Sequence, residues 1–189
     1  LSRSEAPKTS NVSVSASETS LKTTETSTAY IYYTVEDNTA VVYSVAPKNF
    51  ISDEVNPDEP VIISIPQELS GCEVSIASSA FSCISAGISV ECNGVKEIKS
   101  GAFQNCEGIK SLTVSCDFIQ KDAFSNCSNL ESVTLYTDSG TCEVDSYAFR
   151  NCPGLESLTL NGRIIIRSDA FEGCTSLTNL EVEGCSSDL

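Results

Sequence analysis

The stretch Asn105–Phe124 reads NCEGIKSLTVSCDFIQKDAF and carries the pattern that decides the fold. Leu112 and Val114 alternate with small polar residues, which is the period-two pattern of a strand with one buried face. After an expected turn, Ile119 stands four residues before an Ala-Phe pair that supplies one small and one large core side chain. The unit therefore predicts a strand, a turn and a short return segment.

The same phrase recurs along the chain at intervals of 21 to 25 residues. It reads IASSAF, IKSGAF, IQKDAF, VDSYAF and IRSDAF, and it ends at Phe81, Phe103, Phe124, Phe149 and Phe171. The last four phrases are followed, three residues later, by Cys106, Cys127, Cys152 and Cys174. A period of this length is typical of a solenoid, in which each coil buries its apolar face against its neighbours. We therefore expect about five mostly β coils with short helical or 3-10 turns, stacked about 4.8 Å apart so that these Phe and Cys residues form ladders.

The repeat resembles that of the BspA-like leucine-rich repeat family, IGxxAFxxCxxLxxVxIP. The resemblance extends over Val61–Gly184, and IPQELSG at Ile65–Gly71 is similar to the start of a first repeat in that family. The chain departs from the pattern in lacking most strand-ending prolines and in carrying an insertion, TDSGT, at Thr137–Thr141. The resemblance implies a leucine-rich repeat solenoid, and it implies a surface or secreted protein associated with adhesion to host matrix proteins such as fibronectin and fibrinogen.

Composition divides the chain into three segments. Residues 1–28 are rich in Ser, Thr and Glu, so we expect either a flexible linker or stalk, or a frayed terminus. Residues 29–60 hold two apolar runs around Asp37-Asn38, which predict a β-hairpin that caps the first coil. Residues 61–189 form the repeat domain. Because no capping pattern follows Val182, we expect either that the natural protein continues or that another element covers the last coil.

The formal net charge of −15 is spread through the chain and disfavours nucleic acids and anionic membrane surfaces as partners. No apolar run approaches the roughly 20 residues of a membrane span, so we expect no membrane insertion in this segment. The chain begins at Leu1 without an apolar signal segment, and we expect a processed or trimmed form of a longer precursor. The Ser/Thr-rich segment and the family resemblance together predict a secreted or cell-surface location.

The chain has ten cysteines, no histidine and no CxxC motif, which removes the common zinc and thioredoxin signatures. The four cysteines that follow the Ala-Phe pairs are expected to be free, buried thiols that act as small apolar side chains. Cys92 and Cys116 each follow a strand residue by two positions and are the best disulfide candidates, although adjacent in-register strands strain such a bridge.

Catalytic arrangements are disfavoured throughout the sequence. Without histidine, Ser-His and Cys-His nucleophiles are excluded, and a carboxylate pair would need a cleft that small stacked coils do not offer. The acidic stretch Asp53–Pro60 lacks the ligand spacing of an EF-hand loop and is expected to be a solvated loop. We therefore predict a protein that is not an enzyme and that uses no cofactor and no metal.

The remaining hypothesis is display of a surface. Outward strand positions give a candidate binding face made of Thr113, Thr134, Tyr136, Thr159, Asn161 and Glu181. Repeat proteins bind proteins through such sheets, although Ser and Thr also suit exposed strands that have no ligand. The sequence and the resemblance together favour a non-enzymatic extracellular protein-binding or adhesion module, with a protein ligand and host extracellular matrix proteins as the candidate class. The alternative is a structural spacer or assembly unit of a larger surface protein.

Overall fold

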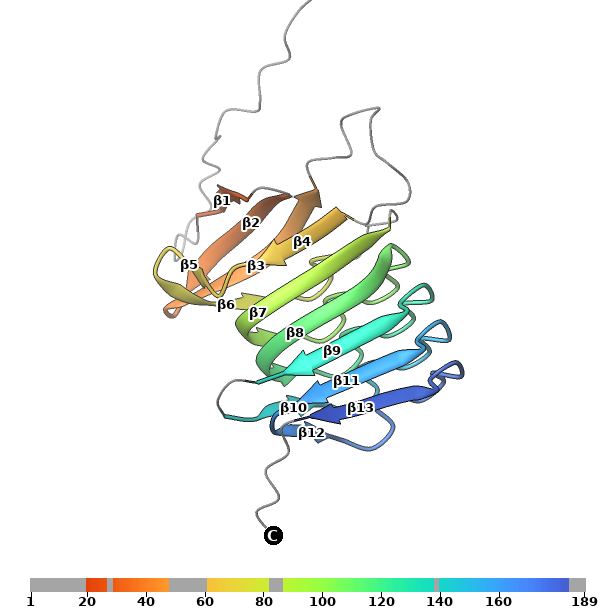
Figure 1. The fold of residues 1–189 in the computed structure, drawn as a ribbon. Helices are drawn as coiled ribbons and strands as arrows, with labels where there is room; N and C mark the ends of the chain where they lie inside the picture. Colours follow the sequence, from red (N-terminus) through yellow and green to blue (C-terminus); the bar gives the residue numbers. More distant parts are fainter. Residues whose placement is uncertain (1–19, 27–28, 48–60, 82–86, 138–139, 184–189) are drawn as a thin grey trace, which may run out of the picture.

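The computed structural model describes residues 20–26, 29–47, 61–81, 87–137 and 140–183, which form thirteen strands of one sheet and no helix. The strands are β1 (Lys22–Glu25), β2 (Ala29–Glu36), β3 (Thr39–Pro47), β4 (Val61–Ile65), β5 (Glu68–Leu69), β6 (Cys72–Ile76), β7 (Ile88–Ile98), β8 (Ile109–Ile119), β9 (Ser132–Tyr136), β10 (Cys142–Val144), β11 (Ser157–Asn161), β12 (Ile164–Ile166) and β13 (Asn179–Glu183). The predicted acidic loop and most of the predicted linker lie outside the described residues. The predicted solenoid of about five mostly β coils is confirmed (Figure 1).

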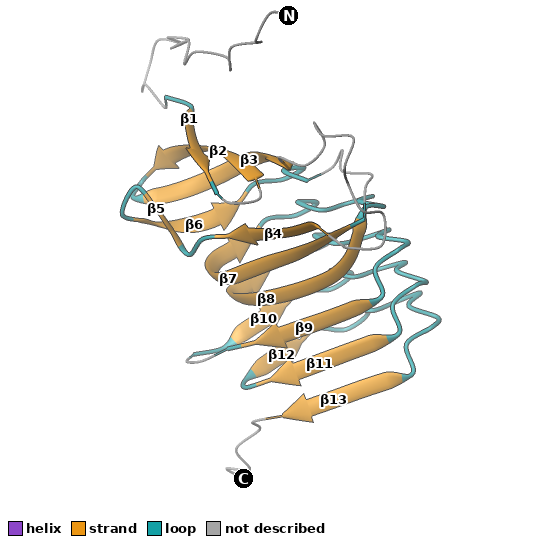
Figure 2. Cartoon of the chain, turned by 45° about the horizontal axis from the view of Figure 1, so that its top comes forward, coloured by secondary structure: helices purple, strands orange, loops and turns teal. Residues whose placement is uncertain are grey.

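Each coil has three sides. The first is a parallel wall in which β4, β7, β8, β9, β11 and β13 lie side by side (Figure 2). The second is a parallel wall of β3, β6, the ends of β7 and β8, β10 and β12. The third consists of turns that contain the Ala-Phe pairs. Apolar side chains from all three sides meet in a continuous core.

Strands β7 and β8 are eleven residues long and belong to both walls, where the sequence predicted a separating turn. The pairing shifts by one residue between Asn93 and Val95, around Gly94 with a φ of 75°. This bulge bends β7 from one wall into the other without ending the strand, a conformation that glycine adopts at low cost. In the next coil the Thr137–Thr141 insertion does separate β9 from β10.

The Ala-Phe segments differ from the predicted helical or 3-10 turns. Residues with a left-handed backbone conformation recur four positions apart, as at Asp122 and Asn126 with φ of 58° and 61°. A right-handed helix cannot continue through such residues. The intervening amides turn toward the next coil, so that Phe124 N–H donates to the Ala148 carbonyl at 2.7 Å. The third side is therefore held by backbone hydrogen bonds between coils.

The five phenylalanines of the repeat stack on one another through the core. Successive ring centroids lie 4.1, 4.6, 4.8 and 4.9 Å apart from Phe81 to Phe171, and the rings become nearly parallel toward the end of the stack. The first four rings are fully buried and Phe171 is half-buried. Burial of each full ring contributes about 1.5–3 kcal/mol, which makes this ladder a principal source of stability.

The N-terminal hairpin forms where the sequence placed it. β2 and β3 pair antiparallel around Asp37 and Asn38, whose φ of 46° and 62° suit a two-residue turn. β3 then pairs parallel to β6 and joins the second wall. Its role as a cap stays a prediction. Lys22–Glu25, which the sequence assigned to a linker, instead pairs with β2 as the edge strand β1.

The predicted Cys92–Cys116 disulfide is wrong, because the two cysteines do not face each other across β7 and β8. Val90 pairs with Leu112, which places Cys92 opposite Val114, and beyond the bulge Cys116 lies opposite Val95. All cysteines of the described segments are free thiols.

Candidate functional site

The exposed side of the first wall carries rows of polar side chains that run across the coils. Thr113 lies in register with Thr134, Thr134 with Thr159, and Thr159 with Glu181. Tyr136 lies in register with Asn161 in a second row. The structure thus brings the six residues of the candidate binding face onto one surface, which we call the outward face.

Alternation within each strand produces this surface. In β8 the side chains of Leu112 and Val114 are buried while those of Ser111, Thr113 and Ser115 are half-buried. Successive side chains of a strand point to opposite sides of the sheet. Strands that pair in register therefore have their outward side chains next to one another and their buried side chains next to one another. The polar rows are therefore a direct consequence of the buried Leu and Val rows.

The outward face extends beyond the six residues named from the sequence. A serine row runs through Ser89, Ser111, Ser132 and Ser157. β4 and β7 add Ser64, Glu91 and Asn93. The VIISIP stretch that forms β4 has the same alternation, but sequence reasoning treated it only as the beginning of the first repeat.

Side-chain hydrogen bonds connect neighbouring strands on this face. Ser111 Oγ donates to Ser89 Oγ at 2.7 Å, and Ser64 Oγ donates to Glu91 at 2.9 Å. Tyr136 Oη reaches two strands away and donates to Asn93 Oδ1 at 2.9 Å. The tyrosine is thereby held across the sheet, so its ring adds the one aromatic contact surface among the described outward positions.

The outward face is acidic at its edges. Glu91 lies toward one end, and Glu181 and Glu183 lie on β13 at the other, with the amide of Asn161 donating to Glu183 at 3.4 Å. The described positions between them carry hydroxyl and amide groups. A surface of this kind offers hydrogen-bond donors and acceptors in the middle and favours neutral or basic partners.

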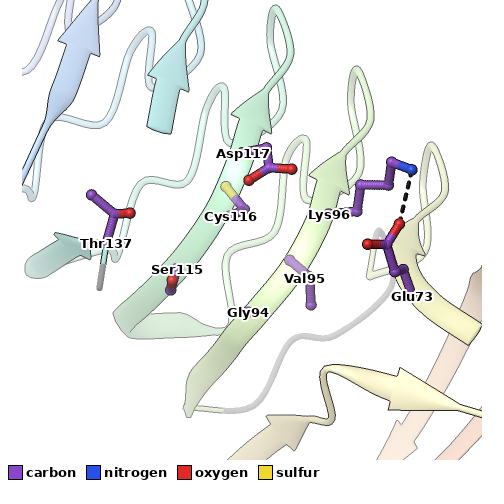
Figure 3. Close-up of a pocket in the computed structure, with 8 residues that line it drawn as sticks. All are labelled: Glu73, Gly94, Val95, Lys96, Ser115, Cys116, Asp117 and Thr137. Carbon is purple, nitrogen blue, oxygen red and sulfur yellow. Dashed lines mark hydrogen bonds and ion pairs between the residues drawn. The ribbon is translucent and has the colours of Figure 1, made fainter. Parts of the chain in front are cut away.

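A shallow depression of about 240 Å³ lies where β7 and β8 bend between the two walls (Figure 3). Its lining includes Glu73, Lys96, Cys116 and Asp117. Lys96 Nζ pairs with Glu73 at 2.9 Å, and this hydrogen bond raises the pKa of Lys96. The ion pair is solvent-exposed and therefore contributes little to stability. The depression therefore presents one exposed ion pair beside the side chain of Cys116.

The cysteines of the repeat have a defined polar role in addition to filling space. Each thiol donates to the carbonyl of a phenylalanine in the preceding coil, at 3.1–3.3 Å. The donors are Cys106, Cys127, Cys152 and Cys174. Contact with the Cys127 sulfur, together with burial, raises the pKa of Cys152 to about 12. Cys152 therefore stays protonated at neutral pH.

Within the described ranges, no group of three or more His, Cys, Asp or Glu side chains is placed to hold a metal ion. No helix that is long and apolar enough to cross a membrane occurs in the same ranges.

The repeat pattern identifies the family. The BspA-type leucine-rich repeat region matches residues 96–187 in six copies. This part of the chain belongs to the BspA-type leucine-rich repeat family. The matched region contains the coils from the second half of β7 onward, whereas the resemblance in the sequence began at Val61.

Two solved structures of leucine-rich repeat proteins are similar to this chain. A leucine-rich repeat protein of T. pallidum is 22% identical, with a TM-score of 0.49, over 80% of this chain and 82% of its own. One from Bacteroides ovatus is 20% identical, with a TM-score of 0.44, over 85% of this chain and 55% of its own. No curated protein matches the chain.

Proposed function

We propose that this BspA-type repeat protein is a non-enzymatic protein-binding module that works in adhesion at a cell surface or after secretion. The observation that carries the proposal is the in-register arrangement of Thr113, Thr134, Thr159 and Glu181 across four strands. Solenoids of this kind bind proteins through extended surfaces of neighbouring repeats.

The chemistry of the outward face indicates the kind of partner. Hydroxyl groups spaced along the strands can form many hydrogen bonds, and Tyr136 provides an aromatic residue of the type that dominates binding energy in interfaces. The carboxylates at both edges attract basic groups. We therefore expect a protein ligand with neutral or basic contact residues, and host extracellular matrix proteins are the class to test first.

The test is a biosensor measurement with immobilised matrix proteins, fibronectin and fibrinogen first. We expect the Tyr136→Ala/Glu181→Lys variant to bind at least about ten-fold more weakly than the wild type, a loss of about 1.4 kcal/mol. The matched control is Tyr43→Ala/Glu107→Lys, which makes the same chemical changes at exposed positions outside the outward face. We expect the control to bind like the wild type.

The dependence of binding on salt concentration is a second readout of the same experiment. Exposed charges are screened over about 10 Å at 0.1 M ionic strength, so wild-type binding should weaken as salt rises. Binding that the face variant leaves unchanged would place the contact elsewhere, on the turns or the hairpin of β2 and β3.

A second candidate function is a spacer or assembly unit of a larger surface protein. Leu180 and Val182 continue the rows of Leu158 and Leu160, yet they are 60% and 54% exposed. An apolar strand in this position favours coverage by a further protein element. If the protein bound none of the matrix proteins tested, this second candidate would be favoured.

A further inference from the structure

Two buried thiols meet away from the cysteine ladder. Cys116 lies in the second half of β8, and Cys142 is the first residue of β10 in the next coil of that wall. Their sulfur atoms are 3.8 Å apart and hydrogen-bonded. Each ladder thiol, by contrast, donates to a phenylalanine carbonyl.

The backbone around this pair is held at a distance that suits a covalent bridge. β8 and β10 pair at Phe118 with Glu143 and at Ile119 with Val144. Continuing this register places Cys142 opposite Asp117, so Cys116 is offset from Cys142 by one residue. Strands about 4.8 Å apart with a rise of about 3.3 Å per residue put the two Cα atoms about 6 Å apart, within the separation of about 4.4–6.8 Å that a disulfide requires. The cysteines lie just beyond the paired residues, so neither is tied into that ladder. Side-chain rotation can therefore bring the sulfur atoms together.

Of the two cysteines, Cys116 borders a depression that opens to solvent. Cys116 lines the depression at the bend of β7 and β8 and is 6% exposed, whereas Cys142 is fully buried (Figure 3). A small reagent can therefore meet Cys116 first and leave Cys142 to complete the reaction from inside.

We propose that Cys116 and Cys142 are a redox modification site that forms a reversible disulfide by exchange with a small-molecule disulfide such as oxidised glutathione. The inference rests on the contact between the two sulfur atoms and does not depend on the proposed binding function.

The exchange proceeds in two displacements. Cys142 loses its proton first, because the hydrogen bond from Cys116 lowers its pKa. As Cys116 attacks one sulfur of the reagent, it transfers its own proton to Cys142, so that a mixed disulfide forms and one thiol is released. Cys142 then loses its proton and attacks Cys116 Sγ, which expels the second thiol. Overall the protein gives up two electrons and two protons, and the S–S bond of the reagent becomes two thiols.

The bridge would close a loop that contains part of the outward face. The chain between Cys116 and Cys142 includes β9, with Thr134 and Tyr136. Oxidation would therefore restrict the motion of the coil that contains these two residues. It would raise the midpoint of thermal unfolding by about 5 °C.

The test is incubation of the folded, reduced protein in glutathione buffers of increasing oxidised fraction, followed by acid quenching, alkylation and peptide mapping by mass spectrometry. We expect the Cys116–Cys142 linkage to appear while the four ladder cysteines remain free. Reductant should reverse it. Recovery of Cys116 and Cys142 as free thiols under strongly oxidising buffer, with circular dichroism unchanged, would overturn the proposal.

Variants separate the two steps. Cys142→Ala should arrest Cys116 as a mixed disulfide with glutathione, whereas the ladder control Cys127→Ala should form the bridge as the wild type does. A Cys142→Ala protein that takes up no glutathione at Cys116 would contradict attack at the exposed sulfur. The wild-type measurement does not depend on the folding of either variant.

Discussion

At the scale of single residues, the stacked phenylalanines dominate the energetics. Phe124 is fully buried, with ring centroids of neighbours at 4.6 and 4.8 Å. Phe124→Ala should lower the free energy of unfolding by about 3–5 kcal/mol because it leaves a cavity between two rings. Thr113→Ala, on the outward face, should cost within about 0.5 kcal/mol. Equal denaturation midpoints for the two variants would contradict the ladder.

A third ladder, formed by asparagines, was not predicted. Asn126 donates to Asn105 at 3.0 Å and accepts from Asn151 at 3.3 Å, and all three have left-handed backbone conformations. Asparagine tolerates this conformation, and its amide can bond to a copy of itself in the next coil. The sequence signal was the asparagine that precedes each of three ladder cysteines.

Asn126 offers a matched pair of substitutions. Asn126→Ala loses both hydrogen bonds and keeps a Cβ at a φ of 61°, so we expect a loss of about 1–2 kcal/mol. Asn126→Gly loses the same bonds but relaxes the backbone and should cost about half as much. Chemical denaturation measures both. A glycine variant less stable than the alanine variant would argue against left-handed strain at this position.

At the scale of the element, the cysteine ladder makes stability depend on pH. The pKa of Cys152 is raised to about 12 from an unfolded value near 9.0. Its contribution is therefore complete below pH 9 and is lost as pH rises toward 12, because only the unfolded state releases the proton. The slope approaches about 1.4 kcal/mol per pH unit for each such thiol.

The measurement is denaturant unfolding between pH 8 and pH 10.5, under reducing conditions. We expect the wild type to lose stability over this range and Cys152→Ala to lose it less steeply. Parallel curves for the two proteins would show that this thiol ionises equally in both states.

The strands could be predicted from the sequence where buried apolar residues alternate with outward polar residues. Alternating residues located β8, β9, β11 and β13, and the Ala-Phe period located the third side. The bulge at Gly94 was not predictable, because a glycine in a strand is compatible with several conformations. That single extra residue shifts the register of the second half of β7, whereas Cys92 and Cys116 do not face each other because Val90 pairs with Leu112.

At the scale of the whole molecule, the candidate site follows from the stacking. The six face residues could be named from the sequence because buried and outward positions alternate. Their neighbours on β4 and β7 were harder to identify, since Ser64 and Glu91 precede the most regular repeats. The identity of the ligand could not be read from the sequence, because hydroxyl side chains suit exposed strands whether or not a partner binds.

The stacking itself is the central claim, since both the outward face and the thiol pair depend on it. The most direct test is nuclear Overhauser spectroscopy on protein with isotope-labelled phenylalanine. We expect ring-to-ring contacts from Phe81 to Phe103, and onward to Phe124, Phe149 and Phe171, because successive centroids are 4.1–4.9 Å apart. Absence of these contacts in a folded sample, or contacts that skip a repeat, would contradict the in-register solenoid.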